Sequence, residues 1–294
     1  MIMDLKTTYM GIELKNPFIV GACDLSEDIS ILEKLENAGA GAIVFKSLFE
    51  EQIQLENMQL GEKLSEYEER HAEMIDLFPD IEHAGPKEHL HKLKKAKSKL
   101  NIPLIASLNA LHKETWIDYA KQIQETGVDG IELNFYSIIR DFEKEGKNVE
   151  AEQIDIIKSV KDVLDIPISV KLSPFYSSIM NVINKMDKAG ADAFILFNSF
   201  FQPDINIDKE EHVKHFNLSS SGDYRYVLRY AGLLYNRIKA DICASHGIET
   251  GLDAVKMILA GAGAIQMVSA IYKEGAATIG KSVKTLEEWV NSRN

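Results

Sequence analysis

The chain has 294 residues, of which 45% are hydrophobic and 27% are charged, a composition typical of a globular protein. Its formal net charge of −12 argues against nucleic acid or an anionic membrane as the main partner. Two cysteines, Cys23 and Cys243, are too few for a disulfide framework, a cysteine-rich metal site or a four-cysteine iron–sulfur cluster. The N-terminus lacks a secretion signal, and no apolar run reaches the ~20 residues of a membrane helix. We therefore expect a cytoplasmic protein without a membrane anchor.

From the N-terminus onward, short apolar runs alternate with amphipathic stretches. Residues 5–9 and 12–14 predict a small hairpin ahead of the first strand, and the first helix ends at Gly39. The predicted strands cover residues 17–22, 42–48, 103–109, 130–137, 167–174, 192–199, 241–248 and 264–271. The later helices are expected at residues 86–100, 113–127, 149–164, 177–190, 224–239, 252–260 and 276–290.

Two segments interrupt this alternation. Residues 50–85, after the second strand, are acidic, rich in methionine and too long for a simple connection. Residues 201–222 form a second long insertion after the sixth strand. Ordered insertions of this length are usually active-site lids or interface loops.

Small residues end the last two strands and open new helices. Ser245, His246 and Gly247 follow the seventh strand, and Val268 and Ser269 follow the eighth. Small residues allow backbone N–H groups to approach a bound group closely, and a helix N-terminus favours an anion. A phosphate held after the last two strands is a known arrangement of eight-fold barrels. This stretch therefore predicts a phosphorylated cofactor or substrate.

Eight strand–helix units in succession can close into a barrel or spread as a doubly wound sheet. No Gly-x-Gly-x-x-Gly motif opens the chain, and the phosphate signature follows strands seven and eight. We therefore predict an α/β fold, a (β/α)8 TIM barrel with an N-terminal hairpin and inserted loops after strands 2 and 6. No linker or break in composition divides residues 1–294, so we expect a single domain.

The active site of such a barrel lies at the C-terminal ends of its strands. Two lysines, Lys46 and Lys171, end otherwise apolar strands, and asparagines and serines end most of the others. A single lysine at a strand end commonly extends to solvent. Two of them within a ring of amides and hydroxyls indicate a polar or anionic ligand that has carbonyl oxygens. The eight histidines show no metal-binding spacing, so we expect no metal.

Ordered motifs along almost the whole chain resemble those of one family. The motifs are Asn16-Pro17-Phe18, Phe45-Lys46-Ser47, Ile131-Glu132-Leu133-Asn134, Val170-Lys171-Leu172-Ser173-Pro174, Asn198-Ser199, Gly247-Ile248-Glu249-Thr250-Gly251-Leu252-Asp253-Ala254 and Tyr272-Lys273-Glu274-Gly275. They are similar to the dihydroorotate dehydrogenases, especially the soluble class 1 type. That family holds FMN in the barrel mouth and oxidises dihydroorotate to orotate. The resemblance therefore implies FMN as the cofactor and one FMN-binding domain.

The resemblance also implies a role for individual residues. Lys171 would lie at the N1–C2 carbonyl edge of the isoalloxazine ring, where a positive charge stabilises the anionic reduced flavin. Gly247 and the turn at Ser269 would hold the phosphate through backbone N–H groups. Lys46 and Ser137 would be the catalytic residues. The implied cofactor-binding residues are Gly21, Ala22, Lys46, Ser47, Asn109, Lys171, Asn198, Ser245, His246, Gly247, Val268 and Ser269, and the implied substrate-binding residues are Lys46, Asn134, Asn198 and Ser199.

The substrate side departs from the class 1 pattern at several points. Ser137 stands where those enzymes have a cysteine base, and serine is the base in the membrane-associated class 2 enzymes. The Pro-Asn pair that follows in the family is absent, so one substrate ligand has become Ile139. The family's Met-Gly-Leu-Pro-Asn loop is replaced by residues 50–85, and His246-Gly247 replaces a glycine pair. The flavin side matches the family better than the substrate side does.

Four functional hypotheses remain open from the sequence. The first is dihydroorotate oxidation, in which Ser137 removes a proton from C5 while a hydride passes from C6 to flavin N5. The second keeps FMN but has another small cyclic or unsaturated substrate, and the third is a non-catalytic flavin-binding accessory protein. The fourth is a synthase or isomerase barrel that binds a phosphate ligand without flavin. We expect a small-molecule substrate, a homodimer and a redox partner protein, with fumarate, a nicotinamide or that partner as electron acceptor.

Overall fold

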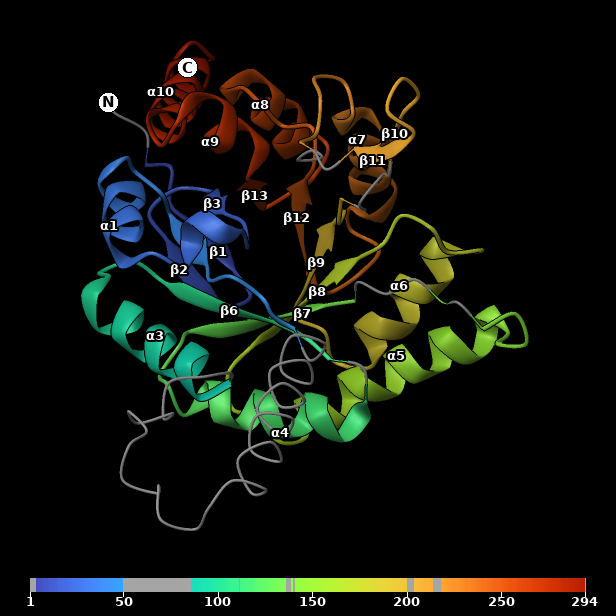
Figure 1. The fold of residues 1–294 in the computed structure, drawn as a ribbon. Helices are drawn as coiled ribbons and strands as arrows, with labels where there is room; N and C mark the ends of the chain where they lie inside the picture. The colour runs from blue at the N-terminus through green and yellow to red at the C-terminus, as the bar shows by residue number, and fades with distance from the viewer. Residues whose placement is uncertain are drawn as a thin grey trace.

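The computed structural model describes residues 4–49, 86–110, 112–135, 139, 141–199, 204–213 and 218–293. Its parallel strands follow the order β4-β3-β13-β12-β9-β8-β7-β6, and pairing of β4 with β6 closes the ring. Figure 1 shows the strands at the centre of the molecule and the helices around them. The predicted (β/α)8 barrel is confirmed.

The strands are shorter than the apolar runs that predicted them. Run 42–48 divides into two pieces, and the second of these pairs with the end of β6. Run 264–271 ends as a strand at Met267, and its last three residues belong to helix α9. The observed strands are β3 Phe18–Val20, β4 Ala42–Val44, β5 Leu48–Phe49, β6 Leu104–Asn109, β7 Gly130–Asn134, β8 Ile168–Leu172, β9 Ala193–Leu196, β12 Asp241–Ser245 and β13 Ala264–Met267.

Each predicted helix is present within a few residues of its expected bounds. Capping side chains fix two of the helix starts: Asp28 accepts a hydrogen bond from the Ser30 N–H ahead of α1, and Thr250 accepts one from the Asp253 N–H ahead of α8. The helices are η1 Asp24–Ser26, α1 Ile29–Asn37, α3 Pro86–Lys99, α4 Lys113–Gln124, α5 Gly146–Lys161, α6 Ile179–Lys188, α7 Tyr224–Leu234, α8 Gly251–Leu259, α9 Ser269–Glu274 and α10 Ala277–Asn291.

The predicted N-terminal hairpin is present and packs against the floor of the barrel, where the strands begin. It consists of β1 Thr7–Tyr9 and β2 Ile12–Leu14. Tyr9 is 1% exposed and packs with Cys243 and other residues of the barrel interior. The Met10 N–H donates a hydrogen bond of 2.8 Å to the carboxylate of Asp241 at the start of β12.

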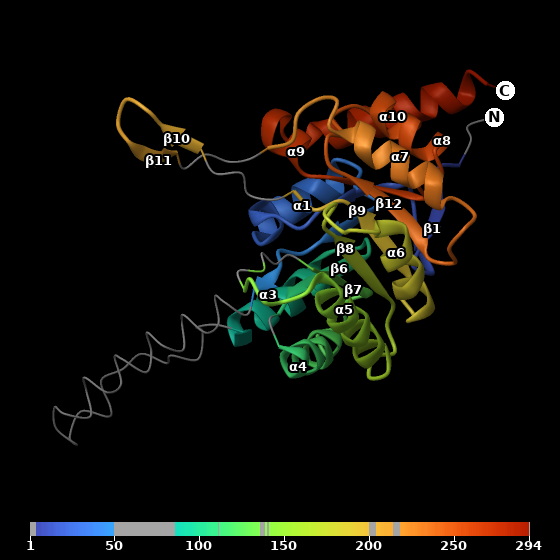
Figure 2. The ribbon, with the colours of Figure 1, turned by 90° about the vertical axis from the view of Figure 1, so that its right-hand side faces the viewer.

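The second insertion forms a small antiparallel hairpin, whereas the first insertion, residues 50–85, lies outside the described residues. Strands β10 Asp204–Asn206 and β11 Glu211–Val213 make up this hairpin. In Figure 2 it stands away from the body of the barrel. Within the described ranges, no helix is long and apolar enough to cross a membrane.

Candidate active site

The barrel interior changes from apolar to polar along the strands. Successive side chains of a strand point to opposite faces, so alternate residues share the interior. On β7, Ile131 and Leu133 pack outward with the helix-facing core. Glu132 and Asn134 alternate with them and therefore lie on the inner face, where both are buried. The polar residues gather toward the C-terminal ends of the strands, where the active site of a barrel is expected.

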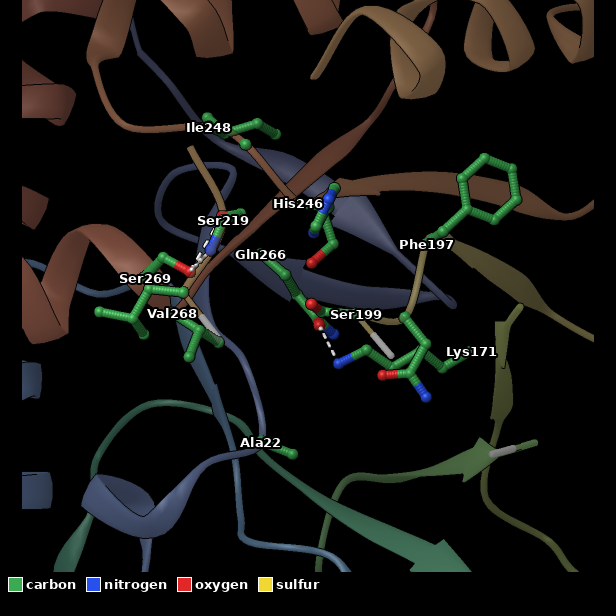
Figure 3. A pocket seen from close by; sticks show the side chains of 14 residues that line it. Ala22, Lys171, Phe197, Ser199, Ser219, His246, Ile248, Gln266, Val268 and Ser269 are labelled. Atoms are coloured by element: carbon green, nitrogen blue, oxygen red, sulfur yellow. Dashed lines mark hydrogen bonds between the residues drawn. The ribbon is translucent and has the colours of Figure 1, made fainter. Parts of the chain in front are cut away.

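A cavity of about 190 Å³ opens at this end of the barrel, between the ends of β3, β8, β9, β12 and β13 (Figure 3). Nine of the residues predicted to bind cofactor or substrate line it. This volume is below the roughly 300–1,000 Å³ of sites that enclose a whole ligand, so the cavity accounts for part of an FMN molecule. The nine residues are Ala22, Lys171, Asn198, Ser199, Ser245, His246, Gly247, Val268 and Ser269.

Four backbone N–H groups in the turns after β12 and β13, three of them on residues that line the cavity, have no acceptor within the described part of the chain. They belong to Gly247, Ile248, Ser269 and Ala270. Buried backbone donors are nearly always paired, so this cluster fits an anion such as a phosphate. The Ser269 hydroxyl accepts hydrogen bonds from the N–H and hydroxyl of Ser219, at 3.0 and 2.9 Å.

Lys171 lies in the wall of the cavity and is 7% exposed. Its Nζ donates a 3.2 Å hydrogen bond to Gln266 Oε1 and lies 3.5 Å from Glu132 Oε1. Figure 3 shows Lys171 and Gln266 meeting at the cavity. A buried ammonium in this position presents positive charge to any ligand in the cavity.

Three asparagines form a hydrogen-bonded row across neighbouring strand ends. Asn109 Nδ2 donates to the Asn134 carbonyl oxygen at 2.6 Å, and Asn198 Nδ2 donates to Asn134 Oδ1 at 2.6 Å. For the described residues, this leaves Asn134 Nδ2 as a donor and Asn198 Oδ1 as an acceptor without a partner. A donor beside an acceptor complements the imide and amide edges of a small heterocycle.

Lys46 does not line the cavity. Its Nζ forms ion pairs with Glu27 at 2.9 Å and Asp24 at 3.2 Å, and its side chain is 29% exposed. Burial alone would lower the pKa of Lys46, but hydrogen bonds to Glu27 and Asp24 outweigh burial and raise this pKa above its usual value. Lys46 therefore carries a firmly held proton.

Gly21 and Ser47 also lie outside the cavity lining. A Cβ at Gly21 would come within 2.7 Å of Val268 Cγ2, so glycine is needed here for packing against the turn after β13. The Ser47 hydroxyl lies 2.7 Å from the Ser107 hydroxyl, and both side chains are buried. These two residues support the strand ends behind the cavity.

The turn after β12 depends on two unusual backbone conformations. His246 has φ = 79° and Gly247 has φ = 72°, which ends the strand at Ser245. A Cβ at Gly247 would lie 2.4 Å from the Tyr224 backbone nitrogen and 2.8 Å from the Asp223 carbonyl carbon. A larger residue at Gly247 would therefore disturb the start of α7 as well as the approach of a ligand.

His246 is partly buried at the turn after β12. Its Nε2 lies 3.7 Å from Asp223 Oδ2, and burial lowers the pKa of the imidazole more than this carboxylate raises it. No group of three His, Cys, Asp or Glu residues able to hold a metal ion occurs in the described ranges.

Sequence reasoning missed Gln266 and Glu132 as parts of the site. Both are polar residues inside apolar strands, flanked by Ile265 and Met267 and by Ile131 and Leu133. The contrast between each polar residue and its apolar neighbours was the sequence signal that could have identified these two residues as part of the site. The predicted base, Ser137, lies outside the described residues, and Ile139 is 45% exposed on the same connection.

Comparisons with known proteins identify the family of the chain. The sequence profile of the family "Dihydroorotate dehydrogenase" matches residues 4–290. The catalytic subunit of dihydroorotate dehydrogenase B (NAD(+)) from Thermoplasma volcanium is 31% identical over 278 residues, which cover 92% of this chain and 88% of the relative. The same subunit from Thermoplasma acidophilum is 30% identical, over 95% of this chain and 90% of the relative. The corresponding subunit from Methanocaldococcus jannaschii is 28% identical, over 92% and 88%. The chain therefore belongs to the dihydroorotate dehydrogenase family, a family of oxidoreductases that act on CH–CH donors.

Proposed function

We propose that this protein binds FMN in the barrel mouth and oxidises dihydroorotate to orotate, a reaction of pyrimidine biosynthesis. The observation that carries the proposal is Lys171, a buried ammonium in the wall of a cavity beside four backbone N–H groups that have no acceptor among the described residues. The N–H groups suit a phosphate, and the ammonium suits a ring system that gains negative charge on reduction. FMN carries both chemical features in one molecule.

The residues that would hold FMN come from four strand ends. Gly247 and Ser269 would bind its phosphate, and Ala22 and Lys171 would contact the rest of the cofactor. When bound, FMN supplies the acceptor for the hydride that leaves C6 of dihydroorotate. Lys171 is placed to stabilise negative charge in the cavity, and its low exposure strengthens that interaction.

The other residues would bind the substrate and move its proton. The Asn134 donor and the Asn198 acceptor, both without a partner among the described residues, would orient the pyrimidine ring. Lys46 would attract the anionic substrate by releasing its present carboxylate partners. Ser137 would take the proton from C5, a general-base step that requires an activating neighbour or water.

The names of the relatives support a proposal for the redox partner and the electron acceptor. Their names specify NAD(+) and a catalytic subunit. We accordingly propose that electrons leave this chain through a partner subunit, with NAD+ as the final acceptor. We also propose that residues 1–294 form one domain that assembles as a homodimer and works in the cytoplasm.

The experiment is a flavin assay followed by an anaerobic reduction assay. The purified protein should absorb near 450 nm and release FMN, and dihydroorotate should bleach that absorbance without oxygen. Tightly bound FAD, or no flavin after reconstitution, would contradict the cofactor assignment. Flavin that dihydroorotate does not reduce would shift the proposal to another small cyclic substrate, which the altered substrate side already suggests at Ile139. Adding NAD+ to the reduced protein alone should leave it reduced, because the partner subunit is missing.

A further inference from the structure

Glu132 is a buried carboxylate that the proposed reaction does not use. It is 0% exposed and lies on β7 two residues before Asn134, deeper in the barrel than the asparagine row. Its Oε2 accepts a 2.6 Å hydrogen bond from Gln266 Nε2. Its Oε1 has no hydrogen-bond donor within the described part of the chain, and Lys171 Nζ lies 3.5 Å away.

Gln266 connects this carboxylate to the cavity. It is 2% exposed and uses both ends of its amide: Nε2 donates to Glu132, and Oε1 accepts from Lys171. The two hydrogen bonds fix the amide orientation, because the carboxylate needs a donor and the ammonium needs an acceptor. Three strands, β7, β13 and β8, thus contribute one continuous polar chain.

The charges of this chain are balanced inside the barrel. An ammonium buried without a counter-charge is costly, and Glu132 supplies a counter-charge 3.5 Å from Lys171. Lys171 lines the cavity, whereas Glu132 does not line it and lies 3.5 Å from the ammonium. A ligand in the cavity therefore experiences a lysine charge that is partly offset by Glu132.

We propose that Glu132 is a positioning residue that acts through Gln266 and Lys171 to set the reduction potential of the bound flavin. The proposal rests on the FMN site proposed above. The carboxylate holds the ammonium at the cavity wall and limits how strongly its charge favours the reduced, negatively charged cofactor. Removing the negative charge while keeping the side-chain shape should therefore make the flavin easier to reduce.

The test compares two replacements that separate charge from volume. Glu132→Gln keeps the shape and can still accept from Gln266, whereas Glu132→Asp keeps the charge and loses one methylene. We expect Glu132→Gln to raise the midpoint potential of the flavin, measured at pH 6, by about 30 mV or more. For a two-electron couple, this shift corresponds to a tenfold change in the reduction equilibrium. Glu132→Asp should stay closer to the wild-type potential. An unchanged potential in Glu132→Gln, or a larger shift in Glu132→Asp, would overturn the proposal.

A remote carboxylate provides the matched control. Glu36 lies on α1, does not line the cavity, and accepts a hydrogen bond from the Asn101 N–H at the protein surface. Glu36→Gln should leave the potential unchanged. A shift of equal size in this variant would show that the effect of Glu132→Gln is not local, and would also overturn the proposal.

A double-variant cycle tests the pair without relying on flavin. Glu132→Gln, Lys171→Met and the double variant are compared with wild type by urea unfolding of the full-length chain without added FMN. We expect the double variant to be more stable than the two single losses predict, because it buries no unpaired charge. Additive losses would overturn the inference.

If the cycle shows coupling between Glu132 and Lys171 but the wild-type protein binds no flavin, the result contradicts the proposed cofactor and not the charge pair. If Glu132→Gln alone is insoluble, recovery of soluble protein in the double variant supports the pair, and failure to recover it counts against the pair.

Discussion

The ends of β4 and β8 each carry a lysine that the sequence predicts to face the active site, but the structure gives the two lysines different surroundings. Lys171 is within β8, is buried, and meets Gln266 and Glu132 inside the barrel. Lys46 comes two residues after β4 and meets Glu27 and Asp24 beside η1 and α1, with its side chain 29% exposed.

This difference shows that a lysine at a strand end takes its role from its neighbours. A residue within a strand is held on the inner face by ladder hydrogen bonds, so Lys171 has a fixed direction. Lys46 lies past the ladder of β4, where a long side chain can reach the acidic residues of a neighbouring segment. We therefore expect Lys171 to tune charge in the cavity and Lys46 to exchange partners when substrate binds.

The largest expected effect is at Ser137, which follows β7 in the sequence, because neither lysine removes the substrate proton in the proposed reaction. Ser137→Ala should keep FMN binding and absorbance near wild type while slowing flavin reduction by dihydroorotate about 10²–10⁴-fold, the contribution of a positioned general base. Stopped-flow reduction measures this rate. Ser137→Cys should be faster than Ser137→Ala, because a thiolate forms more easily than an alkoxide. Equal rates for wild type and Ser137→Ala would remove Ser137 from the mechanism.

Lys171→Met should produce the larger loss of the two lysine variants. The change leaves Glu132 buried without its cation, which typically costs about 3–5 kcal/mol of unfolding free energy. It should also make bound flavin harder to reduce, because the negative charge of the reduced form loses its partner. Urea unfolding and a redox titration measure the two effects. If Lys171→Met changes neither the unfolding free energy nor the midpoint potential, Lys171 does not differ in role from Lys46 as proposed.

Lys46→Met should change substrate binding rather than stability. Its carboxylate partners are partly exposed, so losing these ion pairs should cost less than about 1 kcal/mol. The KM for dihydroorotate should rise by about tenfold, which corresponds to a lost hydrogen bond between charged groups. The midpoint potential should not move. A potential shift as large as that of Lys171→Met would show that Lys46 also acts on the flavin.

The smallest expected effect is the pH dependence of the β4 end. Burial would raise the pKa of Glu27, but hydrogen bonds from Lys92 and Lys46 lower the pKa overall. A carboxyl with a lowered folded-state pKa stabilises the protein above its unfolded pKa, about 4.3 for glutamate, and loses that contribution as the pH falls through the folded value. Glu27→Gln should therefore cost less than about 1 kcal/mol at pH 7 and still less at pH 3. Equal losses in urea unfolding at both pH values would contradict a role for this charge.

The barrel could be predicted from the sequence because apolar runs and helical periodicity repeat eight times. The same signal extended strands too far, since Ser269 and Ile271 are as compatible with a strand as with the helix they open. The cavity residues at strand ends could be predicted once the barrel fold was assigned. Gln266 and Glu132 could not be predicted in this way, because their function depends on three strands that meet only in the closed ring. The orientation of Lys46 toward Asp24 and Glu27 likewise depends on contacts that no single segment encodes.

The hairpin on the barrel floor has a consequence for how the protein is made. Its Met10 N–H bonds to Asp241, a residue 231 positions later, and the neighbouring strand β3 pairs with β13 through Phe18 and Ile265. A ribosome adding about 5–20 residues per second needs on the order of tens of seconds to produce that last strand. Throughout this interval one edge of β3 has no partner, and unpaired edges favour aggregation. The interval before β13 is synthesised is therefore the period in which a chaperone would protect this protein most.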